Sequence, residues 1–163
     1  MGAAAAGSAA GRWRGGARTA CDSTWRARSY PKRRGVAQGL ALGADLPVVP
    51  IPTLAAIAQE VFRTRGWDRV LACLDARMRE VYTAAYARDG GEWREVAPPA
   101  VIAPTEVRRV QAVGDGDWSG AGNGFAAYPA LGGELGLARV AAEARPTAQS
   151  IGELALPRLV TGE

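Results

Sequence analysis

The pattern of apolar and polar residues changes abruptly at Gly35. Before it, residues 1–34 scatter Ala and Gly among basic residues and show no periodic apolar stripe. From Gly35 to Gly43 the spacing predicts a helix with a glycine at every fourth position and with Val36 and Leu40 on an adjoining face. A helix face made of glycines, which have no side chain, allows another backbone to approach closely. That backbone could belong to this fold or to a partner, and both interpretations stay open.

The next segments predict a strand followed by a helix. LPVVPI, residues 46–51, is an apolar run bounded by prolines and predicts a buried strand. Thr53 is expected to cap the following helix, and Gly66 is expected to end it. One face of this helix carries the apolar residues Leu54, Ile57, Ala58, Val61 and Phe62.

Three further strands are predicted to follow one another as a meander. Residues 70–74 are uninterruptedly apolar, which is typical of a strand covered on both faces. Residues 81–86 alternate and predict a second strand, so residues 75–80 are expected to form a hairpin loop. The DGGEW turn then leads into a third strand over residues 93–96.

The remaining part of the chain gives weaker signals. Pro104 predicts the start of a helix over residues 107–111. WSGAGNGFAAY, residues 118–128, lacks the lysine and the serine or threonine of a phosphate-binding P-loop, so we interpret it as a strand-to-helix turn that needs a positive φ. The last apolar stripe, residues 148–159, predicts a helix interrupted by Pro157.

Composition excludes several classes of function. The chain of 163 residues is 48% hydrophobic and 22% charged, which suits a globular protein, and it has no run of about eighteen apolar residues that could span a membrane. It has no histidine, which removes the usual base of nucleophilic triads and every imidazole metal ligand. Cys21 and Cys73 cannot form a four-thiolate zinc site and suggest no disulfide framework, so we expect a reducing cytoplasm.

The basic charge is concentrated at the start of the chain. Residues 1–34 carry seven Arg and one Lys against one Asp, whereas residues 35–163 carry twelve Arg against fifteen acidic residues. We expect residues 1–34 to be poorly ordered. Three interpretations of this segment stay open: a nucleic-acid-binding arm, an organelle-targeting peptide, or sequence without a selected role. We expect only weak, sequence-indifferent binding to nucleic acid.

Three blocks of this sequence together resemble the TsaB (YeaZ) family of bacterial proteins. They are GVAQGLALGADLPVVPIPTLAAIAQ, RVLACLDARMREVYTAAYARDGGEW and WSGAGNGFAAY, and the resemblance covers Gly35 to about Glu163. It implies an α/β fold with mixed sheets, the two-lobe fold of actin, Hsp70 and sugar kinases (ASKHA), with the first lobe incomplete. The implied division is a basic low-complexity segment 1–34, a remnant of the first lobe with its connecting helix 35–69, and a second lobe 70–163.

The resemblance also implies a function. Members are non-catalytic partners of the TsaD transferase, needed for threonylcarbamoyladenosine at position 37 of tRNAs that read ANN codons. The implied partners are TsaD, TsaE through the complex and tRNA indirectly, with a homodimer as the alternative when TsaD is absent. No membrane association and no cofactor are implied, and ATP or ADP is considered only in the complex with TsaD.

The resemblance assigns candidate residues to three kinds of site. Asp75 resembles part of a phosphate loop, and Gly122 and Gly124 resemble part of an adenosine loop, both vestigial. Where the catalytic relative has a metal-binding His-x-x-x-His pair, this chain has Thr53 and Ile57, so we expect no metal. The predicted partner-binding residues are Gly35, Val36, Gly39, Leu40 and Gly43.

This sequence departs from the family pattern at three places. The usual opening strand, hairpin and Gly-Pro-Gly-Ser-Phe-Thr-Gly loop are missing before Gly35, and the usual Tyr-Leu-Arg segment is missing after Glu163. Arg79 stands where members usually have glycine, which would strain the loop if that position needs a positive φ. An inactive truncated or mis-started gene product is therefore one alternative, and a nucleic-acid-binding module that uses the basic arm is a weaker one.

Overall fold

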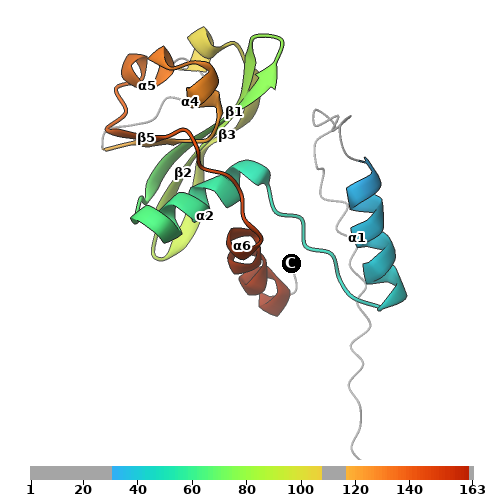
Figure 1. Ribbon diagram of the computed structural model, residues 1–163. Helices are drawn as coiled ribbons and strands as arrows, with labels where there is room; N and C mark the ends of the chain where they lie inside the picture. The colour runs from blue at the N-terminus through green and yellow to red at the C-terminus, as the bar shows by residue number, and fades with distance from the viewer. Residues whose placement is uncertain (1–30, 108–116, 162–163) are drawn as a thin grey trace, which may run out of the picture. The chain divides into compact units, whose positions relative to one another are not determined.

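The computed structural model describes residues 31–107 and 117–161 (Figure 1). The predictions for residues 1–30 therefore lie outside the described residues, as does most of the helix predicted over 107–111. The chain divides into two units, one ending at Val48 and one beginning at Val49, and we call the second the sheet unit. This division does not test the predicted boundaries of the lobes, which stay predictions.

The first unit contains helix α1, Pro31–Gly43. It confirms the helix predicted from Gly35 and begins four residues earlier. The segment that follows does not confirm the prediction, because residues 46–51 form neither a strand nor a helix. Leu46 and Val48 are exposed, and the prolines at positions 47, 50 and 52 have no N–H to donate to a neighbouring strand.

A five-stranded mixed sheet forms the centre of the sheet unit, in the order β3-β2-β1-β4-β5. Neighbours β1 and β2 are antiparallel, as are β2 and β3, which confirms the predicted meander. The short strands β4 and β5 continue the sheet in parallel to β1. A strand before the glycine-rich turn was implied by the predicted strand-to-helix turn, but no bounds were predicted for β4, and β5 was not predicted. The strands span β1 Arg69–Arg77, β2 Glu80–Asp89, β3 Glu92–Ile102, β4 Ser119–Ala121 and β5 Arg139–Ala141.

Helices cover both faces of this sheet (Figure 1). On one face, α2 packs against the sheet and α6 packs against α2. The opposite face is covered by the short helices α4 and α5, whose Phe125 and Leu131 are buried there. The helices span α2 Thr53–Arg65, α4 Gly124–Ala127, α5 Ala130–Glu134 and α6 Ala148–Thr161, and residues Pro104–Glu106 form a 3-10 turn.

The side chains of β1 and β2 alternate between two apolar clusters. Val70 and Ala72 lie in the cluster under α2, whereas Leu71 and Cys73 lie in the cluster under α4 and α5. All four side chains are fully buried, which confirms that β1 is covered on both faces. The alternation of β2 is confirmed in the same way, since Ala84 and Tyr86 belong to the first cluster and Val81 and Ala85 to the second.

Helix α2 carries its predicted apolar face into the core. Leu54, Ile57 and Val61 are at most 2% exposed, and Gly66 ends the helix in the left-handed conformation with φ of 70°. The predicted cap is wrong, because Thr53 is the first helical residue and the N-cap position is taken by Pro52, which makes no side-chain capping hydrogen bond. Pro52 precedes the helix with an extended backbone, and its fixed φ is compatible with this entry.

The β1–β2 hairpin is tighter than predicted. Asp75 and Arg77 belong to β1, and Arg77 pairs with Glu80, so the turn is only Met78 and Arg79. Both turn residues have positive φ, 51° and 63°. This confirms that a side chain at Arg79 stands in a conformation that favours glycine.

Strand β3 is longer than the predicted residues 93–96 because it continues through two prolines. Pro98 and Pro99 lie at an irregularity between the pairs Ala85 with Ala97 and Thr83 with Ala100. Edge strands accept such prolines, since the side facing away from the sheet needs no N–H donors. None of the helices among the described residues is long and apolar enough to cross a membrane.

We predict that Ile57→Ala lowers the free energy of unfolding by about 2–4 kcal/mol, because it removes a side chain that is 0% exposed and leaves a cavity under α2. Leu156→Ala on α6 is the control, since Leu156 is 62% exposed and should change stability by less than about 0.5 kcal/mol. Urea denaturation of both variants measures the difference. Similar losses in the two variants would contradict this packing.

Candidate functional site

The carboxyl ends of β1 and β4 bring together two of the predicted site segments. The backbone N–H of Asp75 donates to Oδ1 of Asn123 over 3.1 Å, which ties the end of β1 to the turn after β4. The Asp75 carboxylate in turn accepts a hydrogen bond of 3.0 Å from the backbone N–H of Arg77. The structure therefore places Asp75 beside the glycine-rich turn, and it gives Asn123 a contact that sequence reasoning did not assign.

Gly122 and Gly124 in this turn lie against Cys73 of β1. A Cβ atom on Gly122 would stand 2.3 Å from the Cys73 carbonyl oxygen, and one on Gly124 would stand 2.4 Å from the Cys73 Sγ. Gly122 also has a φ of 110°, which confirms the strand-to-helix turn with positive φ. Close packing therefore accounts for both glycines, and nucleotide binding at Asp75, Gly122 and Gly124 stays a prediction.

Cys73 itself is a buried packing residue. Its side chain is 0% exposed, and burial, followed by the nearby Asp75 charge, raises the pKa of the thiol to about 12. A thiol with so high a pKa stays protonated near neutral pH and is a poor nucleophile. Cys73 is thus not a candidate for covalent catalysis.

The two positions that the family resemblance matches to a metal-binding histidine pair do not fit a metal ion. Ile57 is fully buried among apolar side chains of the core, and Thr53 is exposed at the start of α2. Neither provides an imidazole, a carboxylate or a thiolate. Within residues 31–107 and 117–161, no group of three or more Cys, Asp and Glu side chains is arranged to hold a metal ion.

Helix α1 presents the predicted partner-binding residues on an open surface. Among the described residues, and apart from neighbouring residues and the backbone of α1 itself, no atom lies within 4 Å of a Cβ built on Gly35, Gly39 or Gly43. Val36 and Leu40 are 63% and 71% exposed. Within the described part of its own unit, the glycine face of α1 and its apolar neighbours are not packed, and their role in partner binding stays a prediction.

A polar network joins α2 to α6 and to the sheet, and sequence reasoning missed it. Gln59 of α2 donates to Glu153 of α6 over 2.6 Å and accepts a hydrogen bond of 2.7 Å from the Trp93 indole. Glu60 accepts a hydrogen bond from Arg63 and one of 2.6 Å from Thr147. The Arg63 hydrogen bond is the main reason that the pKa of Glu60 is lowered, so this carboxylate is ionised at neutral pH. The network fixes α6 and holds no free nucleophile.

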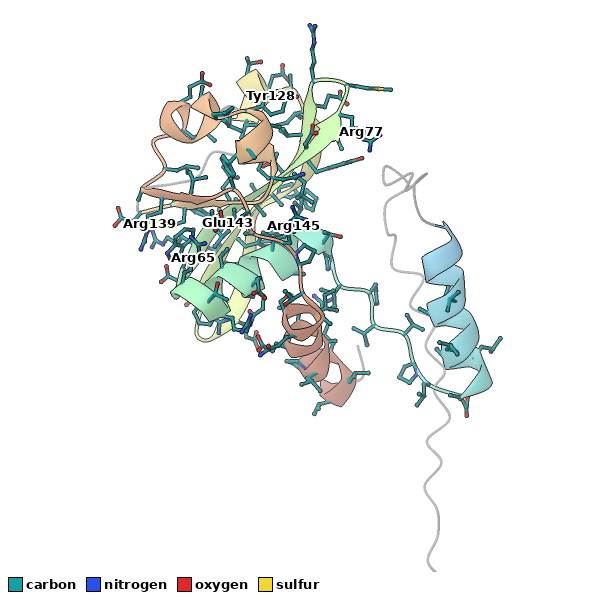
Figure 2. All side chains as sticks on the ribbon, in the orientation of Figure 1. Arg65, Arg77, Tyr128, Arg139, Glu143 and Arg145 are labelled. Atoms are coloured by element: carbon teal, nitrogen blue, oxygen red, sulfur yellow. The ribbon has the colours of Figure 1, made fainter. Side chains whose placement is uncertain are left out.

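Beside this network lies an open hollow of about 530 Å³, between α2 and the segment after β5. Figure 2 shows Arg65, Glu143 and Arg145 gathered there, with Arg139 close by. Arg65 forms an ion pair with Glu143, and the guanidinium groups of Arg65 and Arg139 lie 5.1 and 5.3 Å from the centre of the Trp67 ring. These contacts are structural cation–π interactions, and the lining carboxylates balance the arginines.

Comparison with known proteins gives a family match over most of the chain. Residues 34–158 match the family model described as TsaD: tRNA N6-adenosine threonylcarbamoyltransferase. A relative from Escherichia coli K12, the tRNA threonylcarbamoyladenosine biosynthesis protein TsaB, is 47% identical over 104 residues, which are 63% of this chain and 45% of the relative. The protein of the same name from Haemophilus influenzae is 41% identical over 102 residues, 58% of this chain and 42% of the relative.

Solved structures give the same result for the fold. One is described as an uncharacterized protein with similarity to peptidase YeaZ from Pseudomonas aeruginosa; it has a TM-score of 0.69 and 36% identity over 79% of this chain and 59% of its own. YeaZ from Pseudomonas aeruginosa has a TM-score of 0.67 and 35% identity over 78% and 58% of the two chains. These likenesses confirm the predicted α/β fold class. The chain spans less than half the length of the two curated relatives.

We predict that Gly122→Ala lowers the free energy of unfolding by at least about 2 kcal/mol, because it combines an unfavourable φ with a clash against the Cys73 backbone. Gly133→Ala in α5 is the matched control, since a Cβ there meets nothing within 4 Å and alanine favours a helix by up to about 1 kcal/mol. Thermal unfolding of both variants measures the effect. Unchanged stability of Gly122→Ala would show that the turn is not packed as described.

Proposed function

Because this chain belongs to the TsaB (YeaZ) family, within the broader family described by the matched model, we propose that it is a non-catalytic partner in threonylcarbamoyladenosine formation on tRNA. The observation that supports the non-catalytic part is the burial of Ile57, a position that the family resemblance matches to a histidine ligand of the catalytic relative. No other residue supplies the missing imidazole, because the sequence contains no histidine. The chain would therefore support a reaction that another protein catalyses.

The proposed catalytic partner is TsaD, with TsaE joining through the complex and tRNA held by the assembly. The surface proposed for TsaD is the exposed face of α1, made of Gly35, Val36, Gly39, Leu40 and Gly43. The glycines allow a second helix to approach closely, and Val36 and Leu40 supply apolar area for burial. We place the complex in the cytoplasm and assign no cofactor to this chain, with ATP or ADP bound only together with TsaD.

We predict that the purified chain alone forms no threonylcarbamoyladenosine and contains no stoichiometric zinc or iron, since it lacks the ligands for a catalytic metal. With TsaD, TsaE, ATP, the threonylcarbamoyl donor and tRNA present, adding the chain should increase formation of the modified nucleoside. Mass spectrometry of digested tRNA measures the product, and elemental analysis measures the metal. Product formed without TsaD would refute the non-catalytic role, and no increase on adding the chain would refute the partner role.

We predict that Leu40→Asp lowers the affinity for TsaD by about tenfold or more, because it places a charge at the centre of an apolar contact. Leu156→Asp on α6 is the matched control, since Leu156 is 62% and Leu40 71% exposed, and it should leave the affinity unchanged. Calorimetric titration of TsaD with each variant measures both. Gly39→Leu should weaken binding in the same way. Wild-type affinity in both Leu40→Asp and Gly39→Leu would exclude this face of α1 as the binding surface.

A further inference from the structure

The tip of the β1–β2 hairpin keeps three bulky side chains in a backbone conformation that favours glycine. Arg77, Met78 and Arg79 have φ of 64°, 51° and 63°. A two-residue turn of this type is most easily made by Asn-Gly, and side-chain-bearing residues rarely adopt three such values in succession. Disfavoured backbone conformations persist where the side chains that they present have a use, so the tip is a candidate for a functional role.

Hydrogen bonds at the base of the hairpin also hold the tip in place. Its first residue donates its backbone N–H to the Asp75 carboxylate, and the backbone N–H of Asp75 donates to Asn123 at the end of the neighbouring strand. Pairing of Arg77 with Glu80 closes the hairpin. The side chains of the tip therefore project from a backbone that is held by hydrogen bonds on both strands, which reduces the entropy lost when they bind a ligand.

These side chains are exposed and unpaired. Met78 is 94% exposed, and Arg77 and Arg79 are exposed as well. Across the described part of the chain, no acidic side chain or carbonyl group accepts a hydrogen bond from either guanidinium group. Figure 2 shows Arg77 at the hairpin end of the sheet unit, away from the arginines that line the hollow beside α2.

We propose that Arg77 and Arg79 bind the phosphate backbone of RNA, an inference that rests on the proposed role in tRNA modification. Guanidinium groups recognise phosphate oxygens through paired N–H donors, and such contacts position RNA without reading its sequence. An acidic protein is the less favoured partner, because Met78 is the single exposed large hydrophobic side chain of the tip and protein interfaces have an apolar centre. Asp75 and Glu80 lie beside the two arginines in the hairpin, so phosphate recognition at the tip would come from the exposed guanidinium groups themselves and not from a net positive charge of the segment.

The test is a titration of a fluorescent tRNA transcript with the full chain at several salt concentrations. Replacing both arginines, R77Q/R79Q, should weaken binding by about five- to tenfold near 0.1 M salt and reduce the slope of log affinity against log salt by about 1.5, as two lost phosphate contacts require. R77K/R79K keeps both charges but loses the paired guanidinium donors, so it should bind more weakly than the wild type and more tightly than R77Q/R79Q. The matched control R94Q/R145Q removes two exposed arginines elsewhere and should bind as the wild type does.

A second measurement separates RNA binding from a structural role. Arg79→Gly relieves the unfavourable φ, so it should raise the midpoint of thermal unfolding while it lowers tRNA affinity. A change of both quantities in the same direction would indicate that Arg79 acts on folding alone. Unmeasurable tRNA binding by the wild type, or equal losses in R77Q/R79Q and R94Q/R145Q, would overturn the proposal.

Poly-glutamate serves as the competing acidic ligand. Displacement of tRNA by poly-glutamate with the same dependence on Arg77 and Arg79 would assign the tip to an acidic protein instead. The proposed function is tested independently, because R77Q/R79Q should bind TsaD with wild-type affinity. A chain that binds TsaD and supports the modification but shows no role for the tip in RNA binding would refute this inference alone.

Discussion

Burial of β1 on both faces is the constraint on which the rest of the sheet unit depends. Its residues 70–73 have no exposed surface, so every element that contacts them must bring a complementary apolar side or a bare backbone. Helix α2 meets this demand on one face with a stripe of aliphatic side chains. On the other face the turn after β4 meets it with glycines, because Cys73 leaves no room for a Cβ atom at positions 122 and 124.

The polar network between α2 and α6 follows from the same packing. Gln59 and Glu60 lie on the buried part of α2, where polar groups are costly unless they are paired. Glu153 and Thr147 supply those partners from the last helix and the residue before it. The position of α6 is therefore determined by hydrogen bonds to α2 as well as by apolar contact, although its own exposed leucines contribute little within this chain.

The parts of the fold that sequence could predict are those with a strong local period. The doubly buried run at residues 70–74, the alternation of β2 and the apolar face of α2 each leave a pattern of side chains that tertiary contacts reinforce. Strands β4 and β5 could not be found in this way, because each has only three residues and is defined by its partners in the sheet. LPVVPI was misread because its apolar residues outweighed the prolines that prevent it from pairing.

The candidate site likewise has parts that sequence could predict and parts that it could not. The turn at Gly122 was predicted from glycine content alone, whereas the contact of Asp75 with Asn123 joins residues 48 positions apart that no local pattern connects. The tight hairpin was hidden because Met-Arg is a poor sequence for its geometry, so residue preference pointed to a longer loop.

The paired prolines of β3 have a consequence for how this protein can associate with others. An outer strand recruits a further strand only through a regular row of free N–H and C=O groups, and residues 98 and 99 break that row near its middle. The opposite margin of the sheet, β5, is only three residues long. Cross-β growth and strand exchange between copies are thus disfavoured at both margins, which leaves helices and loop tips as the surfaces through which an assembly can form.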